Sequence, residues 1–464
     1  MRFENIFIYE RNVKWLRGGA IMGIGKVKQN GVTRTVATIL AIVLLLIGLS
    51  SGYFIGISVS PTVVTRTQFV TIGGTVTERI TITVTTAVAQ PTGPPLKIGM
   101  TISKDGLFAP LTSGYEAFNR EWLKWVNNVR KGAWVRELGV RVPIEIIMYD
   151  DKSQPDLAIQ LYTKLATEDN VHILVSPYSA DIGIQLIPAV AERFRVPMIM
   201  AEASTKDMWN KGYKYIVTSM VPYWEDNENG WAANYFDMLA KTKWAKTIAF
   251  VGWDITWAID TYNSGKSLAR KAGLQIVYDK LLPPGTTDFS GVIRELKTIN
   301  PDIVYLAMFG PINALFIKQA AEAGFKPKEW HVIEYGAGFV KSLGPLAEGV
   351  TSDIFWTPSF KYYQSDLLNE LMSRAGLNWV DWQWTELRMI IFQMILAAVE
   401  EAGKLDREAI NDALHKLQIM TVSGPLIIGP QGYGNIGLVT IQIQNGRIQT
   451  VWPPHLANAT YVHP

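Results

Sequence analysis

The 464-residue sequence contains no cysteine. Disulfide bonds, thiolate zinc sites, cysteine nucleophiles and a cysteine-linked lipid anchor are therefore excluded together. Histidine is scarce as well: the chain has five, and none stands in a metal-binding spacing such as His-Glu-x-x-His. We therefore expect no metal, no cofactor and no catalytic residues, and keep a hydrolase only as a minor alternative.

The sequence also lacks a strong excess of either charge. It has 44 lysines and arginines against 41 aspartates and glutamates, a net charge of +3, which gives no general reason to expect a nucleic-acid partner. "DTYNSGKS", residues 260–267, resembles the end of a phosphate-binding loop, but Asp260 replaces the first glycine and the segment fits a helix. We expect no phosphate site there.

Charge is absent altogether from residues 36–59, "VATILAIVLLLIGLSSGYFIGISV". At about 1.5 Å per residue, a helix of this length crosses a hydrocarbon core of ~30 Å. The preceding segment, 1–35, is basic, so we expect it in the cytoplasm and the residues after 60 on the extracellular face of the cell membrane. A cleaved signal peptide is the alternative, although its apolar region is normally shorter. Met22 is an alternative start of the chain.

Residues 60–95 contain eleven threonines and end in proline and glycine. We interpret this stretch as a Thr-rich extracellular stalk, open to O-glycosylation. Alternation such as "TITVTT" is equally typical of β-strands, and that interpretation stays open.

From residue 96 onward, short apolar runs alternate with segments of helical period. The strand candidates include "LKIGMTI", "VPIEIIMYD", "VHILVSP", "VPMIMA", "TIAFVGW", "LQIVYDKLL", "DIVYLAMF" and "WHVIEY". Between the first two, apolar residues from Tyr115 to Val129 recur at steps of three and four, which predicts one buried helix face. Such alternation is typical of an α/β protein with parallel sheets covered on both faces.

Two adjacent carboxylates, Asp150 and Asp151, end one of these strands in "YDDKSQPDLAIQLYTKLATED". Neighbouring side chains on a strand point to opposite faces, so this pair is a poor catalytic dyad. We expect solvated or turn-capping acids, followed by a helix that Ser153 caps and Pro155 begins.

This Asp-Asp segment resembles a signature of the branched-chain amino-acid-binding proteins, the type 1 periplasmic solute-binding subunits of ABC importers. A second segment, "LPPGTTDFSGVIRELKTINPDIVYLAMFGPINALFIKQAAEAGF" at 282–325, is similar to the same family. The resemblance implies an α/β Venus-flytrap of two lobes joined by three crossovers, near 217–222, 348–353 and 420–425. Lobe 1 is then expected at 96–218 plus 352–420, and lobe 2 at 219–351 plus 421–464.

In open α/β sheets, ligands bind beyond the carboxyl ends of the strands. The resemblance implies roles for residues in those loops, with hydroxyls and amides from lobe 1 on a ligand carboxylate and an acid from lobe 2 on its ammonium. The implied ligand-binding residues are Ser179, Asp181, Ala203, Ser204, Trp257, Phe309 and Glu334. Asp181 departs from the pattern, because an aspartate repels a carboxylate unless Ser179 substitutes for it. Glu202 and Asp181 are alternatively charges on the rim, and Ser204 a helix cap.

The resemblance implies a binding protein that delivers a small zwitterionic solute to ABC permease and ATPase subunits. A branched-chain, larger or aromatic amino acid, an amide and a short peptide all stay open as ligands. A membrane-tethered sensor ectodomain is the alternative with the same fold. Only about 34 residues precede the predicted span, too few for a signalling domain, so we favour the importer subunit.

Overall fold

The computed structural model describes residues 64–72, 75–84, 91–228, 230–335, 338–379 and 384–463. The basic segment and the predicted membrane span at 36–59 lie outside these ranges. Across the described ranges, no helix has the length and apolar character needed to cross a bilayer. Within the predicted stalk, β1 (Val64–Ile72) and β2 (Thr75–Val84) pair as an antiparallel hairpin, so the strand interpretation holds for this stretch.

The first sheet has six strands in the order β17-β9-β8-β7-β3-β6, and all of its pairings are parallel. Its strands are β3 (Leu96–Ile102), β6 (Ile144–Asp150), β7 (Ile173–Val175), β8 (Met198–Ile199), β9 (Ile216–Met220) and β17 (Tyr433–Ile436). β7 and β9 are buried at every residue, as expected for a parallel sheet covered on both faces.

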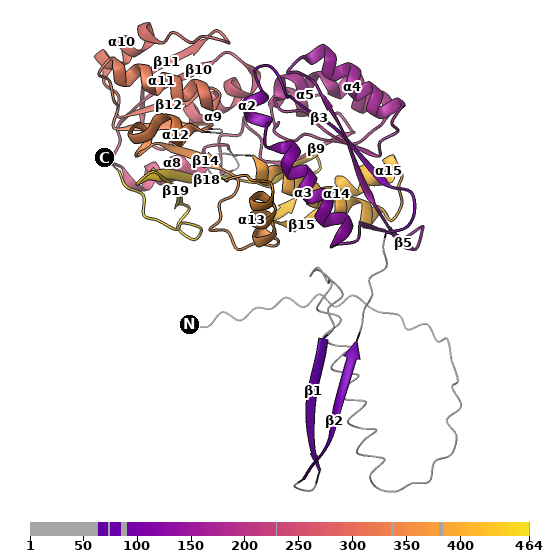
Figure 1. Cartoon of the computed structure of the whole chain (residues 1–464). Helices are drawn as coiled ribbons and strands as arrows, with labels where there is room; N and C mark the ends of the chain where they lie inside the picture. The colour runs from indigo at the N-terminus through magenta and orange to yellow at the C-terminus, as the bar shows by residue number, and fades with distance from the viewer. Residues whose placement is uncertain are drawn as a thin grey trace, which may run out of the picture. The chain divides into compact units, whose positions relative to one another are not determined.

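Helices on both sides of this sheet complete lobe 1 (Figure 1). The longer ones are α3 (Tyr115–Asn128), α4 (Pro155–Thr167), α5 (Ala180–Leu186), α13 (Ser365–Arg374), α14 (Thr385–Ala402) and α15 (Arg407–Leu414). Short elements are α2 (Ala109–Thr112), the π-helical turn η1 (Ile187–Ala191), α6 (Glu192–Phe194) and α7 (Lys206–Trp209). The predicted apolar face of α3 is confirmed: Phe118 and Trp122 on it are almost completely buried.

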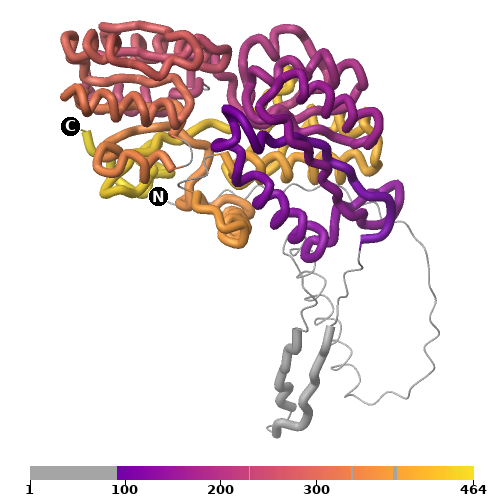
Figure 2. The backbone as a smooth tube through the Cα atoms, turned by 45° about the horizontal axis from the view of Figure 1, so that its top comes forward, coloured from indigo at the N-terminus to yellow at the C-terminus, as the bar shows by residue number. Residues whose placement is uncertain are grey.

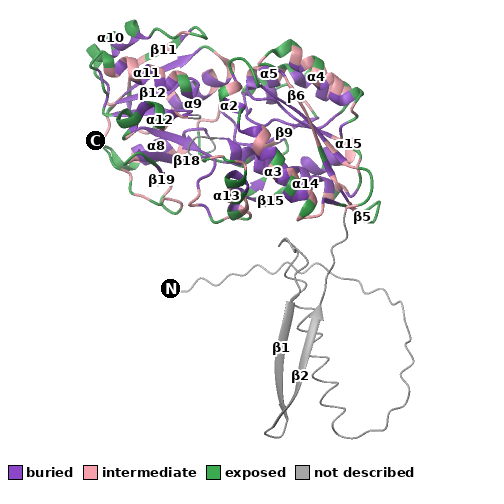
Figure 3. Cartoon of the chain, viewed as in Figure 1, coloured by how far each residue is buried: buried purple, intermediate pink, exposed green. Residues whose placement is uncertain are grey.

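The second sheet has seven strands in the order β11-β10-β12-β13-β14-β18-β19. Its strands are β10 (Thr247–Trp253), β11 (Gln275–Leu282), β12 (Ile303–Ala307), β13 (Glu329–Val332), β14 (Thr351–Ile354), β18 (Val439–Gln444) and β19 (Arg447–Trp452). The first five pair in parallel, and β18 and β19 join them antiparallel. The inner strands of both sheets are buried, the edge strands β6 and β11 are only partly so, and the outer faces of the helices are exposed (Figure 3).

The helices of lobe 2 are α8 (Ala233–Thr242), α9 (Thr256–Lys271), α10 (Ser290–Ile299), α11 (Gly310–Glu322), α12 (Phe339–Leu343) and the 3-10 turn η2 (Gly344–Ala347). The segment 260–267 lies inside α9, as its helical pattern predicts. Gly265 of this helix packs against the rings of Phe250 and Tyr305, where an added Cβ would lie 3.2 Å from each. Close helix–sheet packing, rather than phosphate binding, explains this glycine.

Two small hairpins, β4–β5 (Ala133–Val135, Val140–Val142) and β15–β16 (Gln418–Thr421, Gly424–Ile427), lie beside the main sheets. The chain passes between the sheets three times: after β9, after β14, and between β17 and β18. Figure 2 shows the C-terminal part of the chain, orange to yellow, contributing to both lobes. The third passage follows Ile436 rather than lying at 420–425, because β17 pairs with β9 of the first sheet.

The Asp150–Asp151 pair ends β6 and organises the turn that follows it. Asp151 is completely buried and accepts hydrogen bonds from the Ser103 hydroxyl at 2.6 Å and from the Ser153 amide at 2.9 Å. Asp150 accepts from the Lys104 and Lys152 amides, both at 2.9 Å. Turn capping is therefore confirmed for both acids, whereas solvation is wrong for Asp151.

The residue before α4 also differs from the prediction. Gln154 takes the N-cap position, while the Ser153 hydroxyl donates to the Asp105 carbonyl at 2.7 Å and accepts from the Phe108 amide at 3.1 Å. Ser153 therefore ties two loops together instead of capping the helix. Pro155 begins α4 as expected.

Candidate ligand-binding site

A small cavity of about 30 Å³, with room for a few water molecules, lies between the two lobes. The residues that line it are Tyr178, Ser179, Ala180, Glu202, Met220, Tyr223, Trp231, Trp257, Phe309, Ile333, Glu334 and Trp384. Most of them follow the carboxyl ends of β7, β8, β9, β10, β12 and β13, the edge where α/β sheets bind ligands. Half of the lining side chains are aromatic, two are glutamates, and no lysine, arginine or histidine is among them.

Glu334 follows β13 in lobe 2 and is almost completely buried. Its Oε1 accepts a hydrogen bond from the Tyr178 hydroxyl of lobe 1 at 3.1 Å. Its backbone carbonyl accepts from the Asn313 amide at 2.8 Å, which fixes the loop. Burial raises the pKa of Glu334 to about 7, while the bonds from Tyr178 and the Gly310 amide oppose the rise. A cationic ligand would return this carboxylate to its ionised form.

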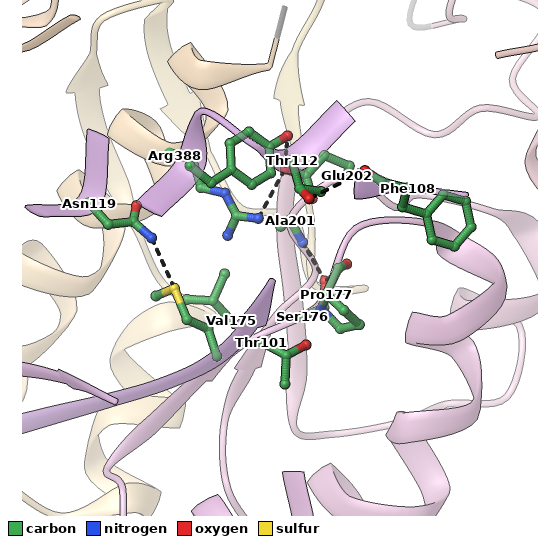
Figure 4. Close-up of polar contacts among 12 residues, drawn as sticks. Thr101, Phe108, Thr112, Asn119, Val175, Ser176, Pro177, Ala201, Glu202 and Arg388 are labelled. Atoms are coloured by element: carbon green, nitrogen blue, oxygen red, sulfur yellow. Dashed lines mark hydrogen bonds and ion pairs between the residues drawn. The ribbon is translucent and has the colours of Figure 1, made fainter. Parts of the chain in front are cut away.

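Glu202 follows β8 in lobe 1 and is only 9% exposed. Its Oε1 accepts from the Tyr115 hydroxyl at 3.0 Å and lies 3.5 Å from Nη2 of Arg388, an ion pair drawn in Figure 4. Burial raises the pKa of Glu202, and Arg388 and Tyr115 oppose that shift. The other oxygen, Oε2, has no hydrogen-bond partner among the described residues. The expectation of an exposed rim charge is therefore wrong: this is a buried acid on the cavity wall.

Arg388 and Glu386 stand in the first turn of α14, behind this wall. Arg388 is 1% exposed, and its guanidinium carbon lies 4.1 Å from the ring centre of Tyr115. The guanidinium makes no hydrogen bond within the described residues, so its ion pair with Glu202 is its main compensation. Glu386 is equally buried, and burial raises its pKa to about 8. Such groups in a water-free environment require fixed partners.

Aromatic rings join the two lobes across the cavity. The ring centre of Phe108 in lobe 1 lies 5.7 Å from that of Phe309 in lobe 2, and Phe309 lies 5.3 Å from Trp257. Tyr178 packs on Phe108 at 5.6 Å. The backbone amide of Lys206 in lobe 1 donates a hydrogen bond of 2.7 Å to Oδ2 of Asp260 in lobe 2, which adds a polar contact between the lobes. The lobes are therefore closed on each other around the cavity.

A second aromatic group, Tyr223, Trp231, Trp384 and Phe355, covers the side of the cavity where the chain passes between lobes. Tyr223 and Trp231 meet edge to face at 4.8 Å, and Trp231 lies 5.8 Å from Trp384. The Tyr223 hydroxyl donates to the backbone carbonyl of Glu202 at 3.1 Å. The cavity is thus enclosed by aromatic rings on two sides.

Four of the seven ligand-binding residues expected from the sequence line this cavity: Ser179, Trp257, Phe309 and Glu334. Asp181, Ala203 and Ser204 do not. Asp181 accepts a hydrogen bond from the Ser179 hydroxyl at 3.3 Å. The hydroxyl that was expected to bind a ligand carboxylate is therefore already engaged. Ser204 is completely buried, and its hydroxyl has no hydrogen-bond partner in the part of the chain that the structure describes. Thr205 takes the N-cap of α7 in its place. What these seven residues bind stays a prediction.

Sequence reasoning missed Tyr178, Tyr223, Trp231 and Trp384 on the cavity wall. Tyr178 lies in the loop after β7, and Tyr223 lies just after the end of β9. Trp384 and Arg388 carry a different signal: "WTELRM" places two charges directly before the long, mostly apolar run of the same helix. Charged residues on a buried helix need a compensating partner, so this segment was a recognisable candidate.

The family model described as a periplasmic binding protein matches residues 95–446, well over half of the chain. The chain belongs to this family. Its members bind solutes and are not enzymes. The matched region contains both sheets except β19, together with every residue that lines the cavity.

Similar proteins agree with this assignment. A Leu/Ile/Val-binding protein of Rhizobium johnstonii is 24% identical over 346 residues, covering 73% of this chain and 89% of its own. A leucine-, isoleucine-, valine-, threonine- and alanine-binding protein of Pseudomonas aeruginosa is 23% identical over 293 residues, which cover 62% of this chain and 75% of its own.

Solved structures show the same fold at low identity. A leucine-binding protein from Thermotoga maritima has a TM-score of 0.64 at 18% identity, covering 77% of this chain and 97% of its own. A solute-binding protein from R. palustris in complex with benzoate also reaches 0.64, at 17% identity, covering 77% and 96%. The two-lobed periplasmic binding protein fold with parallel sheets is therefore established, and one fold holds quite different solutes.

Proposed function

We propose that this protein is the extracellular solute-binding subunit of an ABC importer, and that it captures a small amine-bearing solute for delivery to a permease. The observation that carries the proposal is the position of Glu334. This acid is buried at the end of β13, lines the cavity, and is bonded to the opposite lobe through Tyr178. A buried carboxylate of this kind favours a positively charged group beside it.

Groups from both lobes line the cavity, so a bound solute stabilises the closed arrangement selectively. Charge-assisted hydrogen bonds contribute about 1.5–3 kcal/mol each. Two or three of them, together with burial of apolar surface and less the cost of ordering, account for micromolar binding near −8 kcal/mol. Closure of the lobes is then a signal that a membrane permease is able to recognise.

We propose that the two lobes move about the three chain passages, with the lobe boundaries near 218–222, 351–355 and 436–439. The uncharged run at 36–59 after a basic segment supports a single-pass anchor, with the stalk at 60–95 between anchor and lobes. The alternative of a tethered sensor uses the same cavity. Inspecting the neighbouring genes tests the choice between them: permease and ATPase genes there would favour the importer.

A thermal-shift and calorimetric screen of the fragment 91–464 tests solute capture. Amino acids, amides, small amines, short peptides, aromatic acids and sugars are compared at equal concentration. We expect at least one amine-bearing compound to raise the melting temperature and to change tryptophan fluorescence, because Trp231 and Trp257 line the cavity. A response to sugars alone contradicts the proposal.

A further inference from the structure

The cavity wall carries two acids and no base. Glu202 and Glu334 both line it, and only Glu202 has a basic neighbour, Arg388, which is not itself a lining residue. We propose that the ligand is an organic cation, a protonated or alkylated ammonium that carries no carboxylate. This inference rests on the proposed function and narrows its solute class.

The aromatic lining supports a cation directly. Trp257 and Phe309 of lobe 2 form one aromatic group of the lining, and Tyr223, Trp231 and Trp384 form another. Tyr178 of lobe 1 adds a further ring. Rings that surround a cation attract it through their negative faces, and aromatic enclosures are a known way to hold quaternary ammonium groups. Two carboxylates within the same enclosure strengthen that attraction.

A ligand carboxylate, by contrast, finds no basic side chain on this wall. The Ser179 hydroxyl donates to Asp181, and the Tyr178 and Tyr223 hydroxyls donate to Glu334 and to the Glu202 carbonyl. A carboxylate would also lie beside two acids, which is strongly unfavourable at low dielectric. In a zwitterionic ligand, the ammonium group is therefore favoured by this cavity and the carboxylate is disfavoured.

Indole N–H groups remain as donors for a neutral oxygen on the ligand. The indole N–H groups of Trp231 and Trp257 are buried and have no partner within the described residues. Each is able to donate to a hydroxyl, ether or amide oxygen. A ligand whose ammonium group lies a few bonds from such an oxygen matches both the acidic, aromatic lining and the indole donors.

Isothermal titration of the fragment 91–464 tests this class with matched probes. The probes are choline, ethanolamine, 3,3-dimethylbutan-1-ol as the neutral isostere of choline, leucine as a zwitterion, and benzoate as an anion. We expect choline or ethanolamine to bind at least about ten-fold more tightly than the neutral alcohol, leucine and benzoate. Tighter binding of leucine or benzoate overturns the cation inference but leaves solute capture intact. Binding of none of the probes, together with no response in the thermal-shift screen, overturns both.

Substitutions localise the binding. Trp257→Leu keeps apolar area but removes a ring, so we expect choline affinity to fall about ten-fold with little change for the neutral alcohol. Phe309→Leu is the second variant if Trp257→Leu lowers the melting temperature. Trp134→Leu, on the exposed β4–β5 hairpin, is the control and should bind like the parent. Unchanged choline affinity in both cavity variants overturns the aromatic enclosure.

Discussion

Two glutamates flank the same short strand, β13, and look alike when taken one at a time. Glu329 begins the strand and Glu334 follows its end. Both are almost completely buried, and burial raises the pKa of each to about 7. Each accepts a hydrogen bond from a tyrosine hydroxyl. Burial and pKa therefore do not distinguish them.

The two acids differ in where their partners come from. Glu329 accepts hydrogen bonds from Tyr235 at 2.6 Å, from Thr351 at 3.1 Å, and from Tyr461 in the C-terminal segment. All three belong to lobe 2, and next to them Tyr235 stacks on His331 at 3.7 Å. Glu334 instead faces the cavity and has its hydroxyl partner in lobe 1.

A buried acid whose partners all move with it stabilises one lobe. An acid whose partner belongs to the other lobe couples closure to whatever occupies the space between them. A perturbed pKa is thus only a weak indicator of function, and the origin of the bonding partners decides. Four experiments test this distinction.

The largest effect is expected where a cavity acid depends on one fixed base. Arg388→Met leaves Glu202 buried beside the cavity without its ion pair, so we expect a loss of about 3–5 kcal/mol in the free energy of unfolding. Urea unfolding followed by circular dichroism measures it. The double variant Arg388→Met with Glu202→Gln removes both charges and should recover most of the loss. Equal destabilisation of single and double variants would show that packing of Arg388, not its charge, matters.

The next effect separates the two glutamates of β13. Glu334→Gln should lower affinity for an ammonium ligand about ten- to a hundred-fold, the loss of one charge-assisted contact, with little change in stability. Glu329→Gln is the matched control: it presents an amide to three hydroxyl donors and should cost about 1–3 kcal/mol of stability with unchanged affinity. Calorimetry and urea unfolding of both variants measure the two quantities. The reverse pattern would refute the comparison.

A smaller effect follows from pH. A proton on Glu334 competes with a cationic ligand, and its pKa of about 7 means that the acid ionises between pH 6 and 8. Affinity for choline, whose charge is fixed, should therefore rise about ten-fold from pH 6 to pH 8. Glu329→Gln should keep this rise and Glu334→Gln should lose it. A rise that persists in Glu334→Gln would point to Glu386, whose pKa burial raises to about 8.

Much of the fold was predictable because strand and helix periods are local properties. The run "LKIGMTI" is β3 residue for residue, and "TIAFVGW" is β10. The position of the third passage between the sheets was not predictable, because it depends on the pairing of β17 with β9, a strand more than 200 residues earlier. Hydrophobic pattern alone does not specify such long-range register.

The site was predictable in part for a similar reason. Parallel strands bring their carboxyl ends to one edge, which indicated the loops, and the family resemblance selected Ser179, Trp257, Phe309 and Glu334 within them. Glu202 was misjudged as exposed, because its burial depends on Tyr115 and Arg388 from helices distant in sequence. Partners that only the tertiary fold supplies leave no local pattern.

The smallest effect tests the bond between the lobes itself. Tyr178→Phe removes the hydroxyl that reaches Glu334, so the closed state loses about 0.5–1.5 kcal/mol relative to the open one. Ligand affinity should fall by up to about ten-fold, and small-angle scattering should show a more open unliganded fragment. Tyr115→Phe is the matched control, because its hydroxyl bonds Glu202 within lobe 1 and removing it leaves the opening unchanged. If the two variants open equally, the origin of a partner does not determine its role, and the distinction between Glu329 and Glu334 fails with it.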